Sequence, residues 1–362
     1  MNAADAAVCV ADVERLAGDL LPPDIRDFVA GGGGDESAQA ANRACLDRVR
    51  LVPRVLTSAD GADTAGRLLH GTAAMPVAVA PMAYQRLCHP DGELAMARAA
   101  GKAGVPFTAA TLSSVPIEEI AAVAGTLWFQ LYWLRDRGLV LDLLARAERA
   151  GCTALVLTVD VPVPARRPRD MRNGFTLPAS VVAANLPEGT GSAAHVPMPH
   201  ESAVASHTGI MFENTLGWDD LAWLRGHTGL PVVLKGVLDP GDAVRAVEAG
   251  VSAVVVSNHG GRQLAGAVPS IVALPGVVEA VAGRCEVLFD SGVRSGTDVL
   301  RALAYGAAGV LLGRPLLWGL AMDGEAGAGL VLDLLRAELR EAMLLTGCAD
   351  LSAARTLGTV LL

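Results

Sequence analysis

Aromatic side chains are scarce in this sequence. Phe, Trp and Tyr account for 4% of the 362 residues, although 52% of the residues are hydrophobic. The interior must therefore be built from aliphatic side chains such as Ala, Val and Leu, which suit closely packed layers of helix and sheet. A chain of this length can form one large α/β domain or two ordinary ones.

Positive charge and paired cysteines are also lacking. With 29 Lys and Arg against 38 Asp and Glu, the net charge is −9, which disfavours a nucleic-acid-binding groove. The six cysteines include no C-x-x-C pair, which argues against a zinc site or a disulfide framework and indicates a reducing compartment. We see no secretory signal pattern, and the apolar stretches are interrupted before they reach membrane-spanning length. We therefore expect a cytoplasmic protein with no metal, nucleic-acid or membrane partner.

Eight short apolar runs, many of them β-branched, alternate with longer helix-like stretches. The runs cover residues 76–81, 106–111, 127–132, 154–160, 231–236, 253–257, 286–290 and 309–313. Apolar strands separated by helices indicate a parallel sheet covered on both faces, and eight such units in about 250 residues predict a (β/α)8 TIM barrel. A doubly wound open sheet is the alternative. However, no G-x-G-x-x-G follows the first strand, which disfavours dinucleotide binding of the Rossmann kind.

Two regions lie outside this repeat. We expect an N-terminal helical segment over residues 1–50 and a barrel over residues 51–362. Four glycines at 31–34 would form either a flexible linker or a tight turn close to the site. Residues 161–212 are far longer than an ordinary βα connection, and we interpret them as a lid over the active site, with a disordered decoration as the alternative.

The most informative motif is SNHGGRQ, residues 257–263, which completes a continuous apolar run. A buried strand that stops near His259 and turns through two glycines places a potential base at its carboxyl end. Arg262 returns beside it, and its planar guanidinium can bind a carboxylate through two hydrogen bonds. A base and a carboxylate clamp on one turn suit chemistry at the carbon next to a carboxylate. A capped core strand with a structural His and Arg is the alternative.

Polar residues gather where the predicted strands end. Catalytic groups of (β/α)8 enzymes lie on this face of the barrel. Any one of these residues could be a satisfied polar group at a strand end, but packing does not require the whole set. The set comprises Gln130, Tyr132, Thr158, Asp160, Lys235, His259, Asp290 and Arg314.

The loops after the seventh and eighth strands have the pattern of a phosphate site. Gly292 and Gly313 allow a ligand close to the backbone, and Arg294 and Arg314 would neutralise its charge. Lys235 would face the same opening, and a buried lysine needs an anionic partner or loses its proton. A ring that becomes negative on reduction and a Schiff-base aldehyde are both suitable partners. Glycine-containing turns with surface arginines, and a lysine that reaches solvent, are the structural alternatives.

Six motifs carry a resemblance to a known family. They are FQLY from Phe129, LTVD from Leu157, VLKG from Val233, SNHGGRQ from Ser257, DSGVRSGTD from Asp290 and GRP from Gly313. In this order they resemble the FMN-dependent α-hydroxy acid oxidases and dehydrogenases, which include glycolate oxidase, lactate oxidase and mandelate dehydrogenase. The resemblance extends over nearly the whole chain. Residues 80–93 and 169–175 are similar to the 4-hydroxymandelate oxidases within that family.

The resemblance implies a role for each matching residue. His259 would take a proton from the substrate, and Asp160 would stabilise the protonated imidazole. Arg262 and Arg167 would hold the substrate carboxylate, and Tyr132 would hydrogen-bond to the substrate. The FMN contacts would be Pro81, Met82, Ala83, Ser113, Gln130, Thr158, Lys235, Ser257, Asp290, Ser291, Gly292, Arg294, Gly313 and Arg314. Among these, Lys235 would stabilise the reduced ring, Asp290 would bind the ribityl chain, and the last four would hold the phosphate.

Two positions depart from the family pattern. Phe28 stands where many members have a tyrosine that touches the substrate carboxylate, and a phenyl ring cannot donate that hydrogen bond. The loss is worth about 0.5–1.5 kcal/mol of binding, although an apolar wall suits an aromatic substrate. Ser291 stands where the family motif has a glycine, and the sequence alone gives no account of its effect.

The expected reaction is therefore the oxidation of an aromatic (S)-2-hydroxy acid, 4-hydroxymandelate or mandelate, to the 2-keto acid, with dioxygen reduced to hydrogen peroxide. A dehydrogenase that passes electrons to a quinone or cytochrome would share these motifs. Two further alternatives are a lyase or isomerase that uses Lys235 as a Schiff base and a non-catalytic binding protein. Family analogy also implies a homotetramer.

Overall fold

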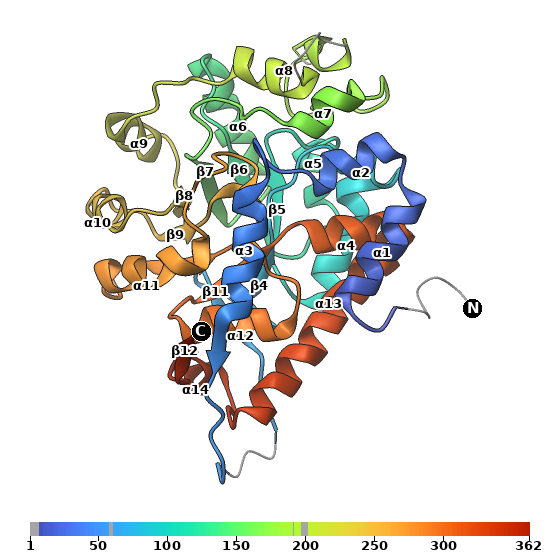
Figure 1. Cartoon of the computed structure of the whole chain (residues 1–362). Helices are drawn as coiled ribbons and strands as arrows, with labels where there is room; N and C mark the ends of the chain where they lie inside the picture. Colours follow the sequence, from blue (N-terminus) through green and yellow to red (C-terminus); the bar gives the residue numbers. More distant parts are fainter. Residues whose placement is uncertain (1–6, 58–60, 191, 197–201) are drawn as a thin grey trace.

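Eight parallel strands close into a barrel in the order β10-β11-β4-β5-β6-β7-β8-β9 (Figure 1). The computed structural model describes residues 7–57, 61–190, 192–196 and 202–362. The barrel strands are β4 (Val77–Val79), β5 (Phe107–Ala110), β6 (Leu127–Leu131), β7 (Ala154–Thr158), β8 (Val232–Val237), β9 (Ala253–Val256), β10 (Glu286–Phe289) and β11 (Gly309–Leu312). Each overlaps one of the eight apolar runs, so the predicted (β/α)8 barrel is confirmed and the open sheet is excluded.

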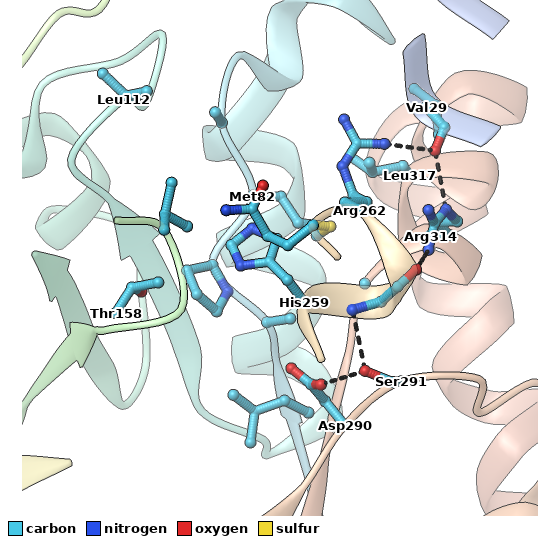
Figure 2. A pocket seen from close by; sticks show the side chains of 18 of the residues that line it. Val29, Met82, Leu112, Thr158, His259, Arg262, Asp290, Ser291, Arg314 and Leu317 are labelled. Atoms are coloured by element: carbon cyan, nitrogen blue, oxygen red, sulfur yellow. Dashed lines mark hydrogen bonds between the residues drawn. The ribbon is translucent and has the colours of Figure 1, made fainter. Parts of the chain in front are cut away.

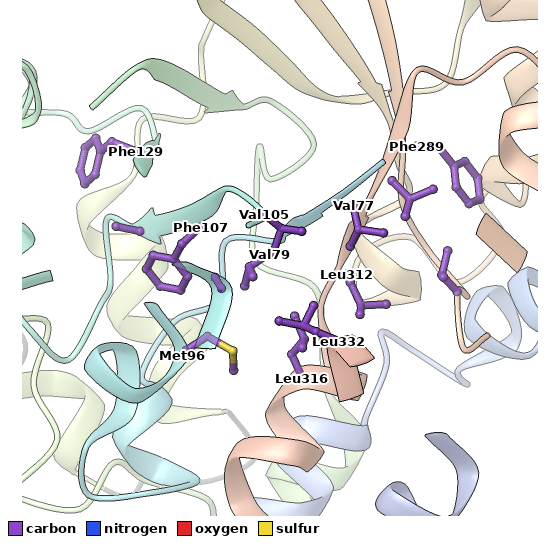
Figure 3. Packing of buried hydrophobic residues seen from close by; sticks show 14 of the residues in the cluster. Val77, Val79, Met96, Val105, Phe107, Phe129, Phe289, Leu312, Leu316 and Leu332 are labelled. Atoms are coloured by element: carbon purple, nitrogen blue, oxygen red, sulfur yellow. The ribbon is translucent and has the colours of Figure 1, made fainter. Parts of the chain in front are cut away.

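The barrel strands bury both of their faces, which explains why they read as continuous apolar runs. Successive side chains point to opposite faces of a strand. On β6, Trp128 belongs to the cluster that also contains Ala154, Val156 and Val255, whereas its neighbour Phe129 belongs to the larger cluster with the helices. Figure 3 shows this outer packing, where Val77, Val79, Phe107 and Leu312 lie near the helix residues Met96, Leu316 and Leu332.

Helices surround the barrel and return the chain from one strand to the next. They are α4 (Gly92–Ala103), α5 (Ile117–Ala121), α6 (Arg137–Arg149), α9 (Trp218–Arg225), α10 (Pro240–Glu248), α11 (Ser270–Val281), α12 (Gly296–Ala304), α13 (Arg314–Leu345) and α14 (Leu351–Arg355). Side chains cap several of them: Asp136 accepts hydrogen bonds from the first turn of α6, and Ser295 accepts one from the amide of Asp298 in α12. Both caps lie in the segments that follow β6 and β10, and these segments also carry the predicted site residues Tyr132 and Asp290.

The amino-terminal end of the barrel is closed by a hairpin of β2 (Gly66–Leu68) and β3 (Gly71–Ala73). Leu68, Leu69 and Ala73 are buried in the same cluster as Trp128, so they fill the bottom of the barrel. β1 (Val49–Leu51) pairs antiparallel with β12 (Thr359–Leu361) in a separate two-stranded sheet. The opening for a ligand is therefore at the carboxyl ends of the strands.

The N-terminal part forms α1 (Val10–Leu20), α2 (Pro23–Ala30) and α3 (Ser37–Arg48). The four glycines between α2 and α3 pass tightly against the SNHGGRQ segment. The amide of Gly33 donates to the carbonyl of Gly261 at 2.9 Å, and a Cβ on Gly33 would lie 2.0 Å from the carbonyl oxygen of Gln263. This contact favours the tight-turn interpretation of residues 31–34 over a flexible linker.

The insertion of residues 161–212 contains α7 (Pro168–Asn173), η3 (Ser192–His195) and α8 (Ala203–Met211), and it lies above the carboxyl ends of the strands (Figure 1). Residues 191 and 197–201 of this predicted lid lie outside the described residues. Arg169 of α7 donates to Glu36 at 2.5 Å and to Asp27 at 3.4 Å, so the insertion is joined to the N-terminal helices. Within the described ranges, no helix has both the length and the apolar character needed to cross a bilayer.

Candidate active site

A cavity with about 1350 Å³ of empty space, its open mouth included, lies at the carboxyl ends of the barrel strands. The structure brings most of the predicted site residues to its wall: Phe28, Pro81, Met82, Ala83, Tyr132, Thr158, Arg167, Lys235, His259, Arg262, Asp290, Ser291, Gly292, Arg294, Gly313 and Arg314. Asp160 and Ser257 stand behind this wall and contact it through hydrogen bonds. Gln130 donates to Thr158 at 3.1 Å, whereas Ser113 accepts from Ala110 within its own turn.

His259 begins a turn of three left-handed residues. Its φ is 58°, and those of Gly260 and Gly261 are 65° and 72°. This conformation, which glycine adopts without steric cost, reverses the chain immediately after β9. Nδ1 of His259 lies 2.9 Å from Oδ1 of Asp160. With Nδ1–H donated to the carboxylate, Nε2 is the nitrogen that can accept a proton.

Asp160 is placed to stabilise a charged imidazole. Burial alone would raise the pKa of its carboxyl, but the neighbouring His259 imidazole and Lys235 lower that pKa, so the carboxylate stays ionised. Gly236 makes room for it, because a Cβ there would lie 2.5 Å from Cβ of Asp160. The second carboxylate oxygen, Oδ2, is buried without a hydrogen-bond partner among the described residues.

Lys235 is a buried cation with a fixed counter-ion. Its Nζ lies 3.0 Å from Oδ2 of Asp290 and donates to Oγ of Ser257 at 3.1 Å. Burial opposes the ammonium, but the carboxylates of Asp290 and Asp160 outweigh it and raise the pKa of Lys235. A protonated lysine cannot attack an aldehyde, so this environment disfavours the Schiff-base alternative.

Nη1 of Arg262 and the Nε and Nη2 of Arg314 donate to main-chain oxygens near the end of α2, and neither guanidinium forms an ion pair with a carboxylate of the described residues. Arg262 donates to the carbonyls of Phe28 and Gly31, and Arg314 donates to those of Val29, Gly31 and Gly260, all between 2.8 and 3.0 Å. Figure 2 shows both guanidiniums beside the carbonyl of Val29. These bonds hold Phe28 over the cavity.

The positive charge of this wall is not balanced. Burial and the neighbouring guanidiniums of Arg167 and Arg314 hold the pKa of Arg262 well below its ordinary value. Burial together with Arg294 and Arg167 lowers the pKa of Arg314 to about 9. Buried cations without a carboxylate partner are costly, so the cavity favours anionic ligands.

The residues present fit FMN. Arg294 and Arg314 flank Gly292 and Gly313 at one side of the cavity, where a phosphate dianion would offset their charge. The backbone at Gly292 has a φ of 93° and leaves no space for a side chain, because a Cβ would lie 2.9 Å from Leu46. Arg167 has a buried Nε without a hydrogen-bond partner among the described residues, and it supplies cationic charge for a second anion, such as a substrate carboxylate.

Two aromatic side chains of the insertion that were not predicted as site residues support the cavity: Phe212 lines it, and Phe175 packs against Phe28. Phe212 stacks on Tyr132 with ring centroids 4.4 Å apart, and Phe175 stacks on Phe28 at 4.7 Å. Arg262 also lies over the Phe28 ring, 5.3 Å from its centroid. A signal was present in the sequence, since two of only six phenylalanines fall in the insertion.

Comparison with known proteins agrees with this geometry. Residues 17–357 match the model of a family described as FMN-dependent dehydrogenase. The chain is 56% identical to 4-hydroxymandelate oxidase of Amycolatopsis orientalis, with 98% of each chain covered, and 46% identical to L-lactate oxidase of Nostoc sp., with 97% of each covered. A crystal structure of mandelate oxidase with (S)-4-hydroxymandelic acid superimposes with a TM-score of 0.96 at 56% identity, covering 98% of this chain and 99% of the other.

Proposed function

We propose that this chain, which belongs to the FMN-dependent dehydrogenase family, oxidises an aromatic (S)-2-hydroxy acid such as 4-hydroxymandelate or mandelate. Family membership makes it an FMN-dependent hydroxy acid oxidase. The choice of an aromatic acid is supported by two features of the same cavity. One wall is aromatic and contains Phe28, Tyr132 and Phe212, and the guanidiniums of Arg167 and Arg262 can bind a carboxylate. Phe28 strengthens this choice, because it adds apolar surface where a tyrosine hydroxyl would favour small polar acids.

Arg167 and Arg262 bind the substrate carboxylate in this proposal. Both guanidiniums line the cavity and neither has a carboxylate partner in an ion pair of the described residues, so a substrate anion relieves their mutual repulsion. Tyr132 is buried beside them and donates its hydroxyl to the substrate; burial and the nearby Asp160 raise its pKa, so it stays a hydrogen-bond donor. The substrate is thereby fixed with its α-carbon near His259.

His259 accepts a proton from the bound substrate at Nε2. Asp160 fixes the tautomer through Nδ1 and stabilises the imidazolium that forms. Bound FMN supplies a ring that takes two electrons from the substrate and passes them to dioxygen, which gives hydrogen peroxide and a 2-keto acid. The ammonium of Lys235 lines the same cavity and would stabilise the negative charge of the reduced ring. Gly292, Arg294, Gly313 and Arg314 would hold the phosphate.

Three further points belong to the proposal. Dioxygen is the electron acceptor, and the 46% identical L-lactate oxidase supports this choice over a quinone. The protein is a homotetramer by family analogy. A reducing, cytoplasmic location is supported by the six cysteines, all of which are free in the structure.

Steady-state kinetics with a coupled peroxide assay tests the proposal. We expect kcat/KM to be higher for (S)-4-hydroxymandelate and (S)-mandelate than for lactate and glycolate, with stoichiometric hydrogen peroxide under air. Equal kcat/KM values for all these acids would refute the aromatic preference. Turnover that depends on an added quinone and yields no peroxide would refute the oxidase assignment.

A further inference from the structure

Ser291 has a backbone conformation that is unusual for a residue with a side chain. Its φ is 85°, in the left-handed region that glycine adopts freely and other residues adopt only under strain. A residue held in this way needs compensating contacts. The residue is buried, with 8% of its surface exposed, so the contacts of its hydroxyl explain why a serine is accommodated there.

The hydroxyl of Ser291 connects two parts of the active site. It accepts a hydrogen bond from the amide of Gly260 at 3.0 Å and donates one to Oδ1 of Asp290 at 2.7 Å. Figure 2 shows Asp290 and Ser291 side by side below the turn that carries His259. Because the hydroxyl donates its single proton to Asp290, it has no proton left to donate to a bound ligand.

A second serine holds the other side of the same residue. The amide of His259 donates to Oγ of Ser257 at 3.0 Å, and Oγ of Ser257 also accepts from Nζ of Lys235. Lys235 in turn pairs with Oδ2 of Asp290 at 3.0 Å. The two amides that flank Cα of His259 are therefore held by two serine hydroxyls, and both serines are attached to one buried ion pair.

We propose that Ser291 is a positioning residue for the catalytic base. By holding the amide of Gly260 against the Asp290–Lys235 pair, its hydroxyl fixes the left-handed turn and so the direction of the His259 imidazole. A base displaced from hydrogen-bond reach of its proton loses much of its rate advantage, although substrate binding is retained. The role applies to any 2-hydroxy acid that the enzyme oxidises, so it goes beyond the choice of substrate.

Two substitutions separate the hydroxyl from the backbone strain. Ser291→Ala removes the hydroxyl and keeps the strained φ, whereas Ser291→Gly removes both. If the hydroxyl positions His259, both variants lose roughly tenfold in kcat, the order expected for one hydrogen bond to a charged network. KM, the Kd of a non-reacting substrate analogue and the Kd of FMN stay within about twofold of wild type. The melting temperature should fall in the Ala variant only, because this variant loses the hydrogen bonds and keeps the backbone strain. In the Gly variant, relief of the strain offsets the loss of the hydrogen bonds.

A matched control is available in Ala282, which has a φ of 52° at the exposed end of α11, away from the cavity. Ala282→Gly relieves the same kind of strain and should leave kcat unchanged. The proposal is overturned if Ser291→Gly keeps the wild-type kcat, or if the Kd of the analogue or of FMN rises in step with the loss of kcat. Wild-type protein is assayed in parallel with the same acid. A failure of the proposed substrate would lower kcat in the wild type as well, whereas the role of Ser291 is tested only by the ratio of the variant kcat to the wild-type kcat.

Discussion

Nδ1 of His259, in the turn that follows β9, lies 2.9 Å from Oδ1 of Asp160, which follows β7. The carboxylate keeps its charge because the imidazole and Lys235 offset the effect of burial on its pKa. One side of the imidazole is thereby committed to the protein and the other remains for the substrate. The proposed chemistry depends on this division.

Removing the imidazole should abolish most of the activity without loss of cofactor. We expect His259→Ala to lower kcat by about 10²–10⁴-fold, the usual contribution of a positioned general base. His227, an exposed histidine whose ring lies tilted against that of Trp223, provides a control, and His227→Ala should keep wild-type kcat. A His259→Ala protein with bound FMN and undiminished turnover would refute the assignment of the base.

Asp160→Asn should act on kcat more than on KM. The amide can no longer stabilise a protonated imidazole, and it can present its NH₂ to Nδ1 and so favour the wrong tautomer. One charge-assisted hydrogen bond is worth about 1.5–3 kcal/mol, which corresponds to roughly a 10- to 150-fold loss in kcat. A change confined to KM would show instead that Asp160 acts in substrate binding.

Arg167→Leu should weaken substrate binding. The guanidinium lines the cavity with a buried Nε that has no hydrogen-bond partner among the described residues, so a substrate carboxylate is its natural partner. Loss of a charged hydrogen bond predicts a rise in KM of about 10- to 100-fold. The amide analogue of the substrate, which has no negative charge, should lose much less. Equal losses for acid and amide would contradict the assignment.

Phe212→Ala should change the selectivity for substrates. Because the Phe212 ring stacks on Tyr132 at 4.4 Å beside the cavity, its removal should raise KM for mandelate by about five- to twentyfold, and KM for lactate should change little. The ratio of the two KM values is the measurement, and lactate is the internal control. A parallel rise for both acids would indicate that Phe212 supports the insertion and does not select the substrate.

Acid stability should depend on Asp298, which is fully buried and pairs with Arg43 at 2.6 Å and with Arg301 at 2.7 Å. Burial alone would raise its pKa, but Arg43 outweighs burial and the pKa falls below its ordinary value of 3.8. The carboxylate therefore stabilises the fold above that pH, and the stabilisation is lost as pH falls through the lowered folded pKa.

Asp298→Asn should accordingly lower the free energy of unfolding at pH 7 by about 3–5 kcal/mol, because it removes the buried carboxylate that pairs with both Arg43 and Arg301 and leaves them only the exposed Asp47. The difference from wild type should shrink as the pH is lowered below 3.8. Asp47→Asn is the control, since Asp47 also pairs with Arg43 but is 56% exposed and should matter little. Chemical denaturation at several pH values measures both, and a difference that is independent of pH would contradict the account.

The barrel was predictable because its strands bury both faces and alternate with helical stretches, so eight apolar runs stand out along the sequence. The polar rim was predictable for a related reason: in parallel strands the carboxyl ends meet on one face, and a residue such as His259 or Lys235 at a strand end is placed by topology alone. These inferences need no knowledge of contacts between distant side chains.

The rest depended on contacts that no local pattern encodes. Phe212 reaches Tyr132 only because the insertion folds back over the barrel. Nη1 of Arg262 and Nη2 of Arg314 both donate to the carbonyl of Gly31 in the N-terminal segment, and the motif around Arg262 does not reveal this contact. Ser291 shows the same limit, since its effect comes from a positive φ together with the amide of Gly260.

The most direct test is the visible spectrum of the purified protein under nitrogen, recorded before and after addition of (S)-4-hydroxymandelate, (S)-mandelate, lactate or glycolate. We predict a yellow protein with stoichiometric FMN whose absorbance bleaches fastest with the two aromatic acids and returns on admission of air. A colourless protein, or a flavin spectrum that none of these acids changes, would contradict the account.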